Sequence, residues 1–312
     1  MSRRSSGVVA VLVTAALWGT TGTAAALAPT VGPWAIGAAA MGVGGLLQSL
    51  IALRPLHRSR RRLRGDARMV GLGAISVAIY PLTFYTSMRL GGVAVGTVVS
   101  LASAPLASAV LERLVDRTAL SRRWTLAVGL AVAGSAVLCL SRSGEPLASP
   151  LATTWSVLLG LVAGVTYAVY SWVVHRLLGR GVERAAAMGA VFGLGGALLV
   201  PVLLATGAPL LASPRSFAVA AYMALVPMFL GYLLFGVGLT RVRPSTATTL
   251  TLAEPAVAAL LAVVVVQQRM SLVGWAGLAV IAVALIVLTV SVPFPGLALA
   301  TDGVGNVDAP DA

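Results

Sequence analysis

One acidic residue, Glu254, lies deep within a long apolar stretch of the chain, nine residues after Ser245, where that stretch begins. Placing an ionised carboxylate in hydrocarbon costs at least ~2.5 to 3.5 kcal/mol, so such a residue normally faces a cavity or a partner. A carboxyl group in that setting would suit proton coupling or the recognition of an amino group. The alternative is structural, with Glu254 capping a helix that Pro255 breaks.

Aromatic residues make up only 6% of the chain, yet several gather in a few apolar stretches. Tyr80 and Phe84 are four residues apart, and Phe229 and Tyr232 are three apart, so each pair is expected to share one face of a helix. Such side chains could orient a substrate against the apolar wall of a cavity, and packing between helices is the alternative for each. The predicted substrate-binding residues are Trp18, Tyr80, Phe84, Tyr85, Tyr167, Tyr170, Phe229, Tyr232, Thr249 and Glu254.

Two prolines, Pro105 and Pro255, occupy matching places in two stretches rich in small residues. Each proline removes one backbone donor and disturbs the carbonyl one turn earlier, which leaves polar backbone available within a helix. Interrupted helices at corresponding places of two halves point to a binding site near the middle of a membrane. We therefore predict a helix break at each proline, with a kink that serves only packing as the alternative.

The composition indicates a membrane protein, because 58% of the residues are hydrophobic and only 10% are charged, against roughly 25% charged in a soluble domain. A bilayer core of about 30 Å needs roughly 20 apolar residues per helix. Ten charge-poor stretches are of about that length: 7–28, 31–53, 69–88, 92–111, 124–140, 153–174, 186–206, 217–239, 245–266 and 272–292. The sequence therefore predicts an all-α integral membrane protein with ten transmembrane helices.

The basic residues predict the orientation of these spans. All 22 are arginines, seven of them lie between positions 54 and 68, and the net charge is +13. With the N-terminus in the cytoplasm, 18 arginines fall on the cytoplasmic side and four outside. Both termini are therefore expected in the cytoplasm, and the lysine-free composition indicates the plasma (inner) membrane of a bacterium. We expect contact with membrane lipid, including anionic head groups near the arginine-rich connection, and no nucleic-acid partner.

The chain resembles itself at an offset of 150 residues, which aligns Pro105 with Pro255 inside the segments SLASAPLASAVL and TLAEPAVAALLA. This predicts one five-helix repeat at 1–142, a second at 143–292, and a disordered cytoplasmic tail at 293–312. Because five is odd, the second repeat must enter the membrane from the opposite side.

The segments AALWG (15–19) and TLAEPAVAALL (251–261), with two five-helix halves, resemble the ten-span EamA-type exporters of the drug/metabolite transporter superfamily. The resemblance covers about residues 8–292. It implies two inverted repeats around a central cavity and export of amino acids, related metabolites or toxic small molecules without ATP hydrolysis. In many relatives the second span carries an Arg, where this chain has Met41, and the ninth span ends in Gly-Glu, where this chain has Gln267, Gln268 and Arg269.

Several functions are disfavoured by what the sequence lacks. Without lysine it has no GxxxxGK[ST] loop for ATP, and with two histidines and one cysteine it has no HExxH motif and no cysteine cluster. We expect no enzyme, no cofactor and no metal site. The prediction is a secondary transporter that exports small metabolites by alternating access, with a small-molecule substrate and proton coupling as a further option. The alternative is a non-transporting membrane scaffold or accessory subunit; a channel is harder to exclude.

Overall fold

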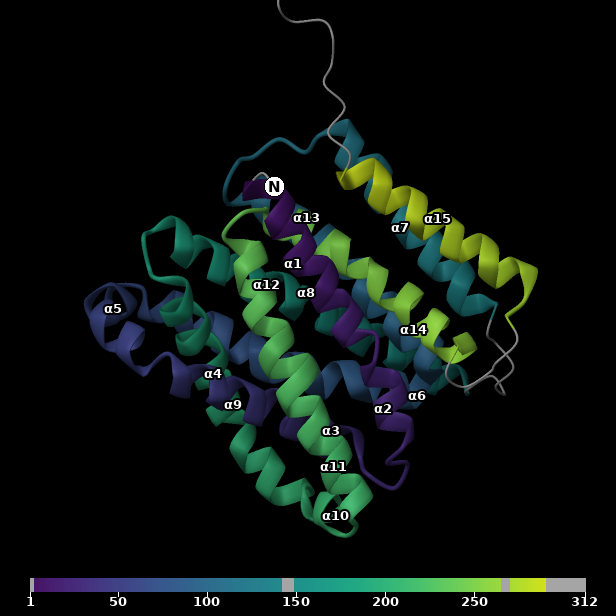
Figure 1. Cartoon of the computed structure of the whole chain (residues 1–312), viewed down its shortest axis with the longest axis horizontal. Helices are drawn as coiled ribbons and strands as arrows, with labels where there is room; N and C mark the ends of the chain where they lie inside the picture. The colour runs from purple at the N-terminus through teal and green to yellow at the C-terminus, as the bar shows by residue number, and fades with distance from the viewer. Residues whose placement is uncertain (1–2, 142–148, 265–269, 290–312) are drawn as a thin grey trace, which may run out of the picture.

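The computed structural model describes residues 3–141, 149–264 and 270–289, and every regular element within them is a helix (Figure 1). Eight helical segments in these residues are long and apolar enough to cross a membrane. They are Ser5–Ala25, Pro33–Ile51, Ala67–Gly92, Val95–Leu114, Pro150–Gly179, Arg184–Thr206, Pro214–Leu239 and Leu272–Thr289. The prediction of an all-α membrane protein is confirmed.

The other two predicted spans correspond to one further helix and to one interrupted helix. The stretch 124–140 lies in α7 (Arg122–Leu140), and the stretch 245–266 is divided into α13 (Pro244–Leu250), η3 (Thr251–Ala253) and α14 (Glu254–Val264). The remaining elements are α1 (Arg3–Trp18), α2 (Thr21–Ala26), α3 (Pro33–Gly37), η1 (Ala38–Val43), α4 (Gly44–Ile51), α5 (Leu53–Gly65), α6 (Ala67–Leu114), α8 (Pro150–Gly179), α9 (Arg184–Thr206), α10 (Ala208–Leu211), α11 (Pro214–Met223), η2 (Ala224–Leu230), α12 (Gly231–Leu239) and α15 (Leu272–Thr289). Gln267, Gln268, Arg269 and the predicted tail 293–312 lie outside the described residues.

Helix α6 contains two spans because the chain turns back sharply at Gly92. That residue has φ 82° and ψ 156°, a conformation open to glycine and strained for other residues. A Cβ on Gly96 would lie 2.6 Å from the backbone nitrogen of Met88, whereas eight residues of straight helix would separate them by about 12 Å. The two glycines therefore allow a tight turn between the third and fourth spans.

The helices pack in pairs that agree with a two-fold relation between the halves. Helix α1 packs against α12, and their counterparts in the other half, α6 and α8, also pack together. Helix α4 packs against α9, and α7 packs against α15, so these two pairs each join equivalent helices. Figure 1 shows α7 and α15 side by side along one edge of the bundle. A two-fold rotation that exchanges the two five-span units would leave this set of helix pairs unchanged.

Glycine residues allow the helices of the α6–α8 and α4–α9 pairs to pack closely. A Cβ on Gly164 of α8 would lie 2.6 Å from the carbonyl oxygen of Ser100 in α6, and one on Gly193 of α9 would lie 2.4 Å from the Cβ of Ser49 in α4. Glycine lets two backbones approach where any side chain would hold them apart. The spans are therefore joined by backbone packing as well as by apolar side chains.

Two spans contain π-helical turns, η1 in the second span and η2 in the eighth, and these two turns contact each other. Pro227 lies inside η2. π-Helical turns are rare and occur frequently at functional sites. Residues of both turns line the cavity described below.

The arginine-rich connection between the second and third spans is helical, since α5 covers 13 of its residues. Leu56 and Leu63 pack against the core and Ser59 is buried, whereas Arg58 and Arg61 are exposed. The spacing of the inward residues follows one face of a helix. The charge that predicts orientation is therefore carried by an amphipathic helix rather than by an extended loop.

Candidate functional site

A cavity lies between the two halves and is lined by residues from five spans. The lining residues are Trp18, Thr21, Gly37, Ala40, Met41, Tyr80, Pro81, Phe84, Tyr85, Met228, Tyr232 and Glu254. Its volume is about 20 Å³, which is room for about one water molecule. In this conformation the cavity is too small for an organic substrate.

Glu254 is the first residue of α14 and follows the 3₁₀ turn η3 directly. It is 8% exposed and lines the cavity. Its carboxylate accepts no hydrogen bond and forms no ion pair with any residue in the described part of the chain. A capping carboxylate would accept backbone N–H groups, so the structural alternative for Glu254 lacks the contacts it needs.

Two tyrosine hydroxyls share this cavity with Glu254. Tyr80 and Tyr85 both line it, and neither hydroxyl has a hydrogen-bond partner among the described residues. Tyr232 lines the same cavity, and its hydroxyl is paired with that of Tyr170. The side-chain oxygens of Glu254, Tyr80 and Tyr85 are not among the fully buried unpaired polar atoms of the described residues, so they remain accessible from the cavity.

Trp18 connects the first span to the eighth. Its indole Nε1 donates a hydrogen bond to the carbonyl oxygen of Pro227 (2.9 Å), and Thr14, one turn earlier, donates to the carbonyl oxygen of Gly231 (3.0 Å). The ring of Trp18 lies 4.8 Å from that of Tyr232, centroid to centroid. Trp18 is thus held by the π-helical segment and forms part of the cavity wall.

Gly19 brings the two segments that carry the family resemblance into contact. A Cβ on Gly19 would lie 2.8 Å from the Cβ of Val257 and 3.0 Å from the carbonyl oxygen of Glu254. The first span also stops being regular there, because α1 ends at Trp18 and α2 begins at Thr21. The AALWG segment therefore packs directly on the interrupted ninth span, at the residue that carries the carboxylate.

The predicted substrate-binding residues fall into two groups. Trp18, Tyr80, Phe84, Tyr85, Tyr232 and Glu254 line the cavity, whereas Tyr167, Tyr170, Phe229 and Thr249 are not among its lining residues in the described structure. The hydroxyl of Tyr170 pairs with that of Tyr232 at 2.7 Å, and the hydroxyl of Tyr167 pairs with Thr251 Oγ1 at 3.0 Å. These two tyrosines form a layer behind the cavity wall.

Phe229 and Thr249 make other contacts. Thr249 is buried and its hydroxyl donates to the carbonyl oxygen of Ser245 (2.6 Å), within its own helix. Phe229 is half-buried, and it lies in η2, where the turn is wider than 3.6 residues. The ring of Tyr232 contacts those of Trp18, Tyr170, Phe192 and Phe235, and no ring contact with Phe229 is found in the described structure.

The two matched prolines differ in their surroundings. Pro255 follows a change from α-helix to 3₁₀ turn at Thr251–Ala253, whereas α6 continues through Pro105 without a change of helix type. An irregular turn thus precedes Pro255, and the break predicted at Pro105 is not found. Of the two matched prolines, Pro255 alone therefore follows an irregular turn.

Several cavity residues had no signal in the sequence. Thr21, Met41, Pro81 and Met228 line the cavity, and Phe192 contacts Tyr232 from behind at 4.5 Å. The resemblance to EamA-type exporters implies an arginine at the position of Met41, and this departure was the one feature that could have drawn attention to it. The others are ordinary apolar residues until the helices are packed.

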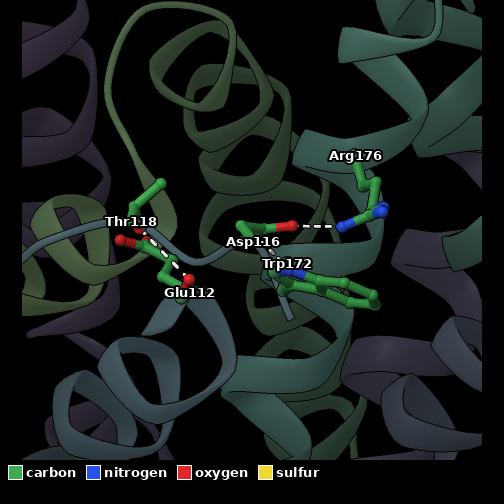
Figure 2. Close-up of polar contacts among 5 residues, drawn as sticks. All are labelled: Glu112, Asp116, Thr118, Trp172 and Arg176. Carbon is green, nitrogen blue, oxygen red and sulfur yellow. Dashed lines mark hydrogen bonds and ion pairs between the residues drawn. The ribbon is translucent and has the colours of Figure 1, made fainter. Parts of the chain in front are cut away.

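A second polar cluster, at one end of the bundle, contains Glu112, Asp116, Thr118, Trp172 and Arg176 (Figure 2), and Arg180 and Arg243 lie at the same surface pocket. Glu112 is 2% exposed, and its carboxylate accepts from the backbone N–H and the hydroxyl of Ser245, at 2.7 and 2.8 Å. Asp116 accepts from the indole of Trp172 (2.8 Å) and pairs with Arg176, which also lies over the Trp172 ring. Both acidic residues come from the first half and both bind the second half.

Further contacts join the halves at this end, which we call the arginine-rich end and define by Asp66, Glu112, Asp116, Arg176 and Arg180. Asp66 pairs with Arg180, and Arg62 donates to the carbonyl oxygen of Gly181. Deeper in the bundle, the hydroxyl of Thr248 donates to that of Ser108 at 3.4 Å. Polar contacts between the halves therefore extend inward from this end.

Among the described residues, no group of three or more His, Cys, Asp or Glu could hold a metal ion.

A sequence profile of the EamA-like transporter family matches twice, at residues 5–140 and 154–290. The chain is 33% identical over 282 residues to "Uncharacterized transporter YwfM" of Bacillus subtilis (strain 168), and the match covers 89% of this chain and 92% of that protein.

A solved structure, titled "Crystal structure of protein", matches with a TM-score of 0.76, and the match covers 92% of this chain and 97% of the other. Its sequence identity of 20% shows a shared fold alone. The twofold match of the family profile covers most of the chain and agrees with the pairs of equivalent helices. The chain is therefore a multi-pass membrane protein and a transporter, not an enzyme, and it belongs to the EamA-like transporter family of the drug/metabolite transporter superfamily.

Proposed function

We propose that this transporter exports small metabolites, such as amino acids, related compounds or toxic small molecules, by alternating access at the cavity around Glu254. The observation that carries the proposal is the group of unpaired polar atoms there: the Glu254 carboxylate and the hydroxyls of Tyr80 and Tyr85. A transport site must leave polar groups free to bind its cargo. We assign the substrate contacts to these three residues together with Trp18 and Tyr232.

The two repeats are proposed to be residues 1–142 and 143–292, inverted relative to each other and rocking about the cavity. The pairing of equivalent helices, α4 with α9 and α7 with α15, supports a two-fold axis between them. Spans from both halves line the cavity. A rocking motion of one half against the other would therefore change the volume available at Glu254.

The contacts at the arginine-rich end are proposed to hold one side of the transporter closed. Glu254 lies nine residues beyond Ser245, about 14 Å along a helix axis at 1.5 Å per residue. The Glu112–Ser245 and Ser108–Thr248 contacts fill that distance between the halves. By the excess of arginine this end faces the cytoplasm, so loading of cargo for export requires these contacts to separate.

Glu254 is also proposed as the residue that exchanges a proton if a proton gradient drives export. The titratable groups that share its cavity are Tyr80, Tyr85 and Tyr232. Arg and His are absent from the described lining of the cavity. A proton or a cationic cargo is therefore the natural partner of this carboxylate.

The test is efflux from proteoliposomes loaded with a mixed pool of amino acids, amines and other metabolites, read by mass spectrometry with and without an imposed pH gradient. We expect selective loss of one chemical class that changes with the gradient. Efflux that is the same with and without the pH gradient would contradict proton coupling. An absence of selective loss under both conditions would overturn it and favour the scaffold alternative.

Alternating access is tested by labelling a cysteine at Thr249, in a chain whose own Cys139 is replaced by Ala. Thr249 is 1% exposed in the closed conformation, so a thiol there reacts only when the halves separate. We expect membrane-impermeant reagents to label it from the arginine-rich side, at a rate that changes when cargo is added. A rate that is constant under all cargo and gradient conditions would contradict the rocking motion.

A further inference from the structure

We infer that the cargo is a small organic cation, an amine or a quaternary ammonium ion without a carboxylate, rather than a zwitterionic amino acid. The inference deepens the proposed function and rests on it, because it assigns a substrate class to the same cavity. Three features of the lining carry it: its charge, the blocked helix terminus at Glu254, and its aromatic side chains.

The charge of the lining favours a cation. Glu254 is the one charged residue among the described residues that form the cavity, and it has no partner there. A cationic group would neutralise it. The carboxylate of an amino acid would instead enter a site that offers it no Arg, Lys or His, and a buried charge without a partner is strongly disfavoured.

The backbone offers no replacement for the missing basic residue. Interrupted helices in transporters commonly bind a substrate carboxylate with the free N–H groups at a helix N-terminus. Here α14 begins with Glu254 followed by Pro255. The position is already occupied by an acidic side chain, and proline supplies no N–H donor. The terminus therefore offers little to an anion.

The aromatic side chains supply the second half of a cation site. Five of the twelve lining residues are aromatic, Trp18, Tyr80, Phe84, Tyr85 and Tyr232. Their rings contact one another in two groups: Tyr80 with Phe84 at 5.5 Å and Phe84 with Tyr85 at 5.3 Å, and Trp18 with Tyr232 at 4.8 Å. Aromatic faces attract ammonium groups through their quadrupoles, and sites built from several rings recognise quaternary ammonium ions.

The cavity must widen before cargo can bind, because its volume of about 20 Å³ has room for about one water molecule. Met41 and Met228 line it from η1 and η2, and their unbranched thioether side chains can rearrange at little cost. The same side chains contribute no charge, so widening leaves Glu254 as the group that selects cargo.

The test compares pairs of ligands that differ in one group, measured by calorimetric titration of the purified full chain in lipid nanodiscs. Leucine and isoamylamine share a side chain and differ in the carboxylate. Choline and 3,3-dimethyl-1-butanol share a shape and differ in the positive charge. We expect isoamylamine and choline each to bind at least about tenfold more tightly than its partner. Equal or tighter binding of leucine would overturn the inference, as would equal binding of the neutral alcohol.

Variants assign the effect to this cavity. We expect Glu254→Gln to reduce the binding of both cations at least about tenfold. Glu183→Gln, which alters an exposed glutamate at the start of α9, should leave binding unchanged. Because the ligand pairs are compared on the unmodified protein, the test stands even if a variant fails to fold. Unaltered binding to a folded Glu254→Gln protein would also overturn the inference.

The same ligands in the proteoliposome assay separate the two proposals. Efflux of leucine with no efflux of isoamylamine would overturn the cation inference and leave the transport proposal standing. Cation binding in nanodiscs without efflux of any compound would overturn the transport proposal and, because the cargo class depends on transport, the inference with it. Efflux of isoamylamine and choline, with leucine retained, supports both.

Discussion

Glu112 and Glu254 are both buried glutamates within the bundle, at 2% and 8% exposure, but their surroundings are opposite. Glu112 accepts two hydrogen bonds from Ser245, whereas Glu254 has no partner among the described residues. Glu112 lies among the contacts that join the halves, and Glu254 faces a cavity between them. Burial of the residue alone therefore does not distinguish the two glutamates; their hydrogen bonds and their access to the cavity do.

The contrast extends to the two regions. At the arginine-rich end, Asp66, Glu112 and Asp116 each have a partner. In the cavity, Glu254, Tyr80 and Tyr85 have none in the described structure. Satisfied networks make a conformation rigid, whereas polar groups that face a cavity stay open to a partner. Substitutions at Glu254, Glu112 and Asp116 test this contrast between the two regions, and a substitution at Gly19 tests the packing beside Glu254.

The largest effect is expected for Glu254→Gln. Gradient-driven efflux should fall by at least about 100-fold, because a charge that pairs with cargo in a low-dielectric site contributes several kcal/mol. The melting temperature in detergent should change little, since the carboxyl group has no hydrogen-bond or ion-pair partner to lose in the described structure. A variant that melts much earlier than the unmodified protein would place Glu254 among the structural residues and break the comparison.

Glu112→Ala should instead lower stability. Removing the carboxylate leaves the backbone N–H and the hydroxyl of Ser245 without an acceptor, which costs about 1 to 3 kcal/mol. Glu112→Gln keeps one carbonyl oxygen as an acceptor and should lose less. Denaturation of both variants in the same detergent measures the difference; equal stability of all three proteins would contradict the role of Glu112 as a structural partner.

Gly19→Ala tests the contact between the first and ninth spans. Its Cβ would lie 2.8 Å from the Cβ of Val257, and overpacking of this kind costs about 1 to 3 kcal/mol. A Cβ on Gly22, three residues later, would meet no atom within 4 Å in the described structure. Gly22→Ala should therefore be neutral or slightly stabilising. Equal melting of the two variants would mean that the close approach at Gly19 is relaxed in the membrane.

Asp116→Asn should have the smallest effect. The Asp116 and Arg176 side chains are 25% and 34% exposed, and pairs of this kind contribute about 0 to 1 kcal/mol. The asparagine oxygen can still accept from the indole of Trp172. We expect a shift of about a degree or less in melting temperature, and faster labelling of the Thr249 cysteine from the arginine-rich side. Slower labelling would show that this ion pair does not hold the end closed.

Much of the fold could be predicted from the sequence because few backbone structures are stable in the hydrocarbon core of a membrane. Apolar stretches of about 20 residues predict spans, and the offset of 150 predicts two halves. Glu254 stood out for the same reason, since a carboxylate in such a stretch is rare. The helix in the arginine-rich connection was not predicted, because its apolar residues, Leu56 and Leu63, are sparse among arginines.

The rest of the site could not be predicted because it depends on packing between distant segments. Glu112 falls at the edge of a predicted span, and only its approach to Ser245 reveals its role. The orientation of Phe229 depends on a π-helical turn that no residue type specifies. Met41 and Met228 became recognisable as cavity residues once η1 and η2 were seen to touch.

The π-helical turns have a consequence for how this family varies. A π turn is a place where an α-helix accommodates one residue more than a regular turn needs. A relative with one residue fewer within Ala224–Leu230 would keep Tyr232 pointing at the cavity while regaining a regular helix. Single-residue deletions at Ala38–Val43 and Ala224–Leu230 are therefore expected to be tolerated. Elsewhere in a span, a deletion would rotate every residue that follows. Related transporters can thus differ in length at the cavity wall while the rest of each span keeps its orientation.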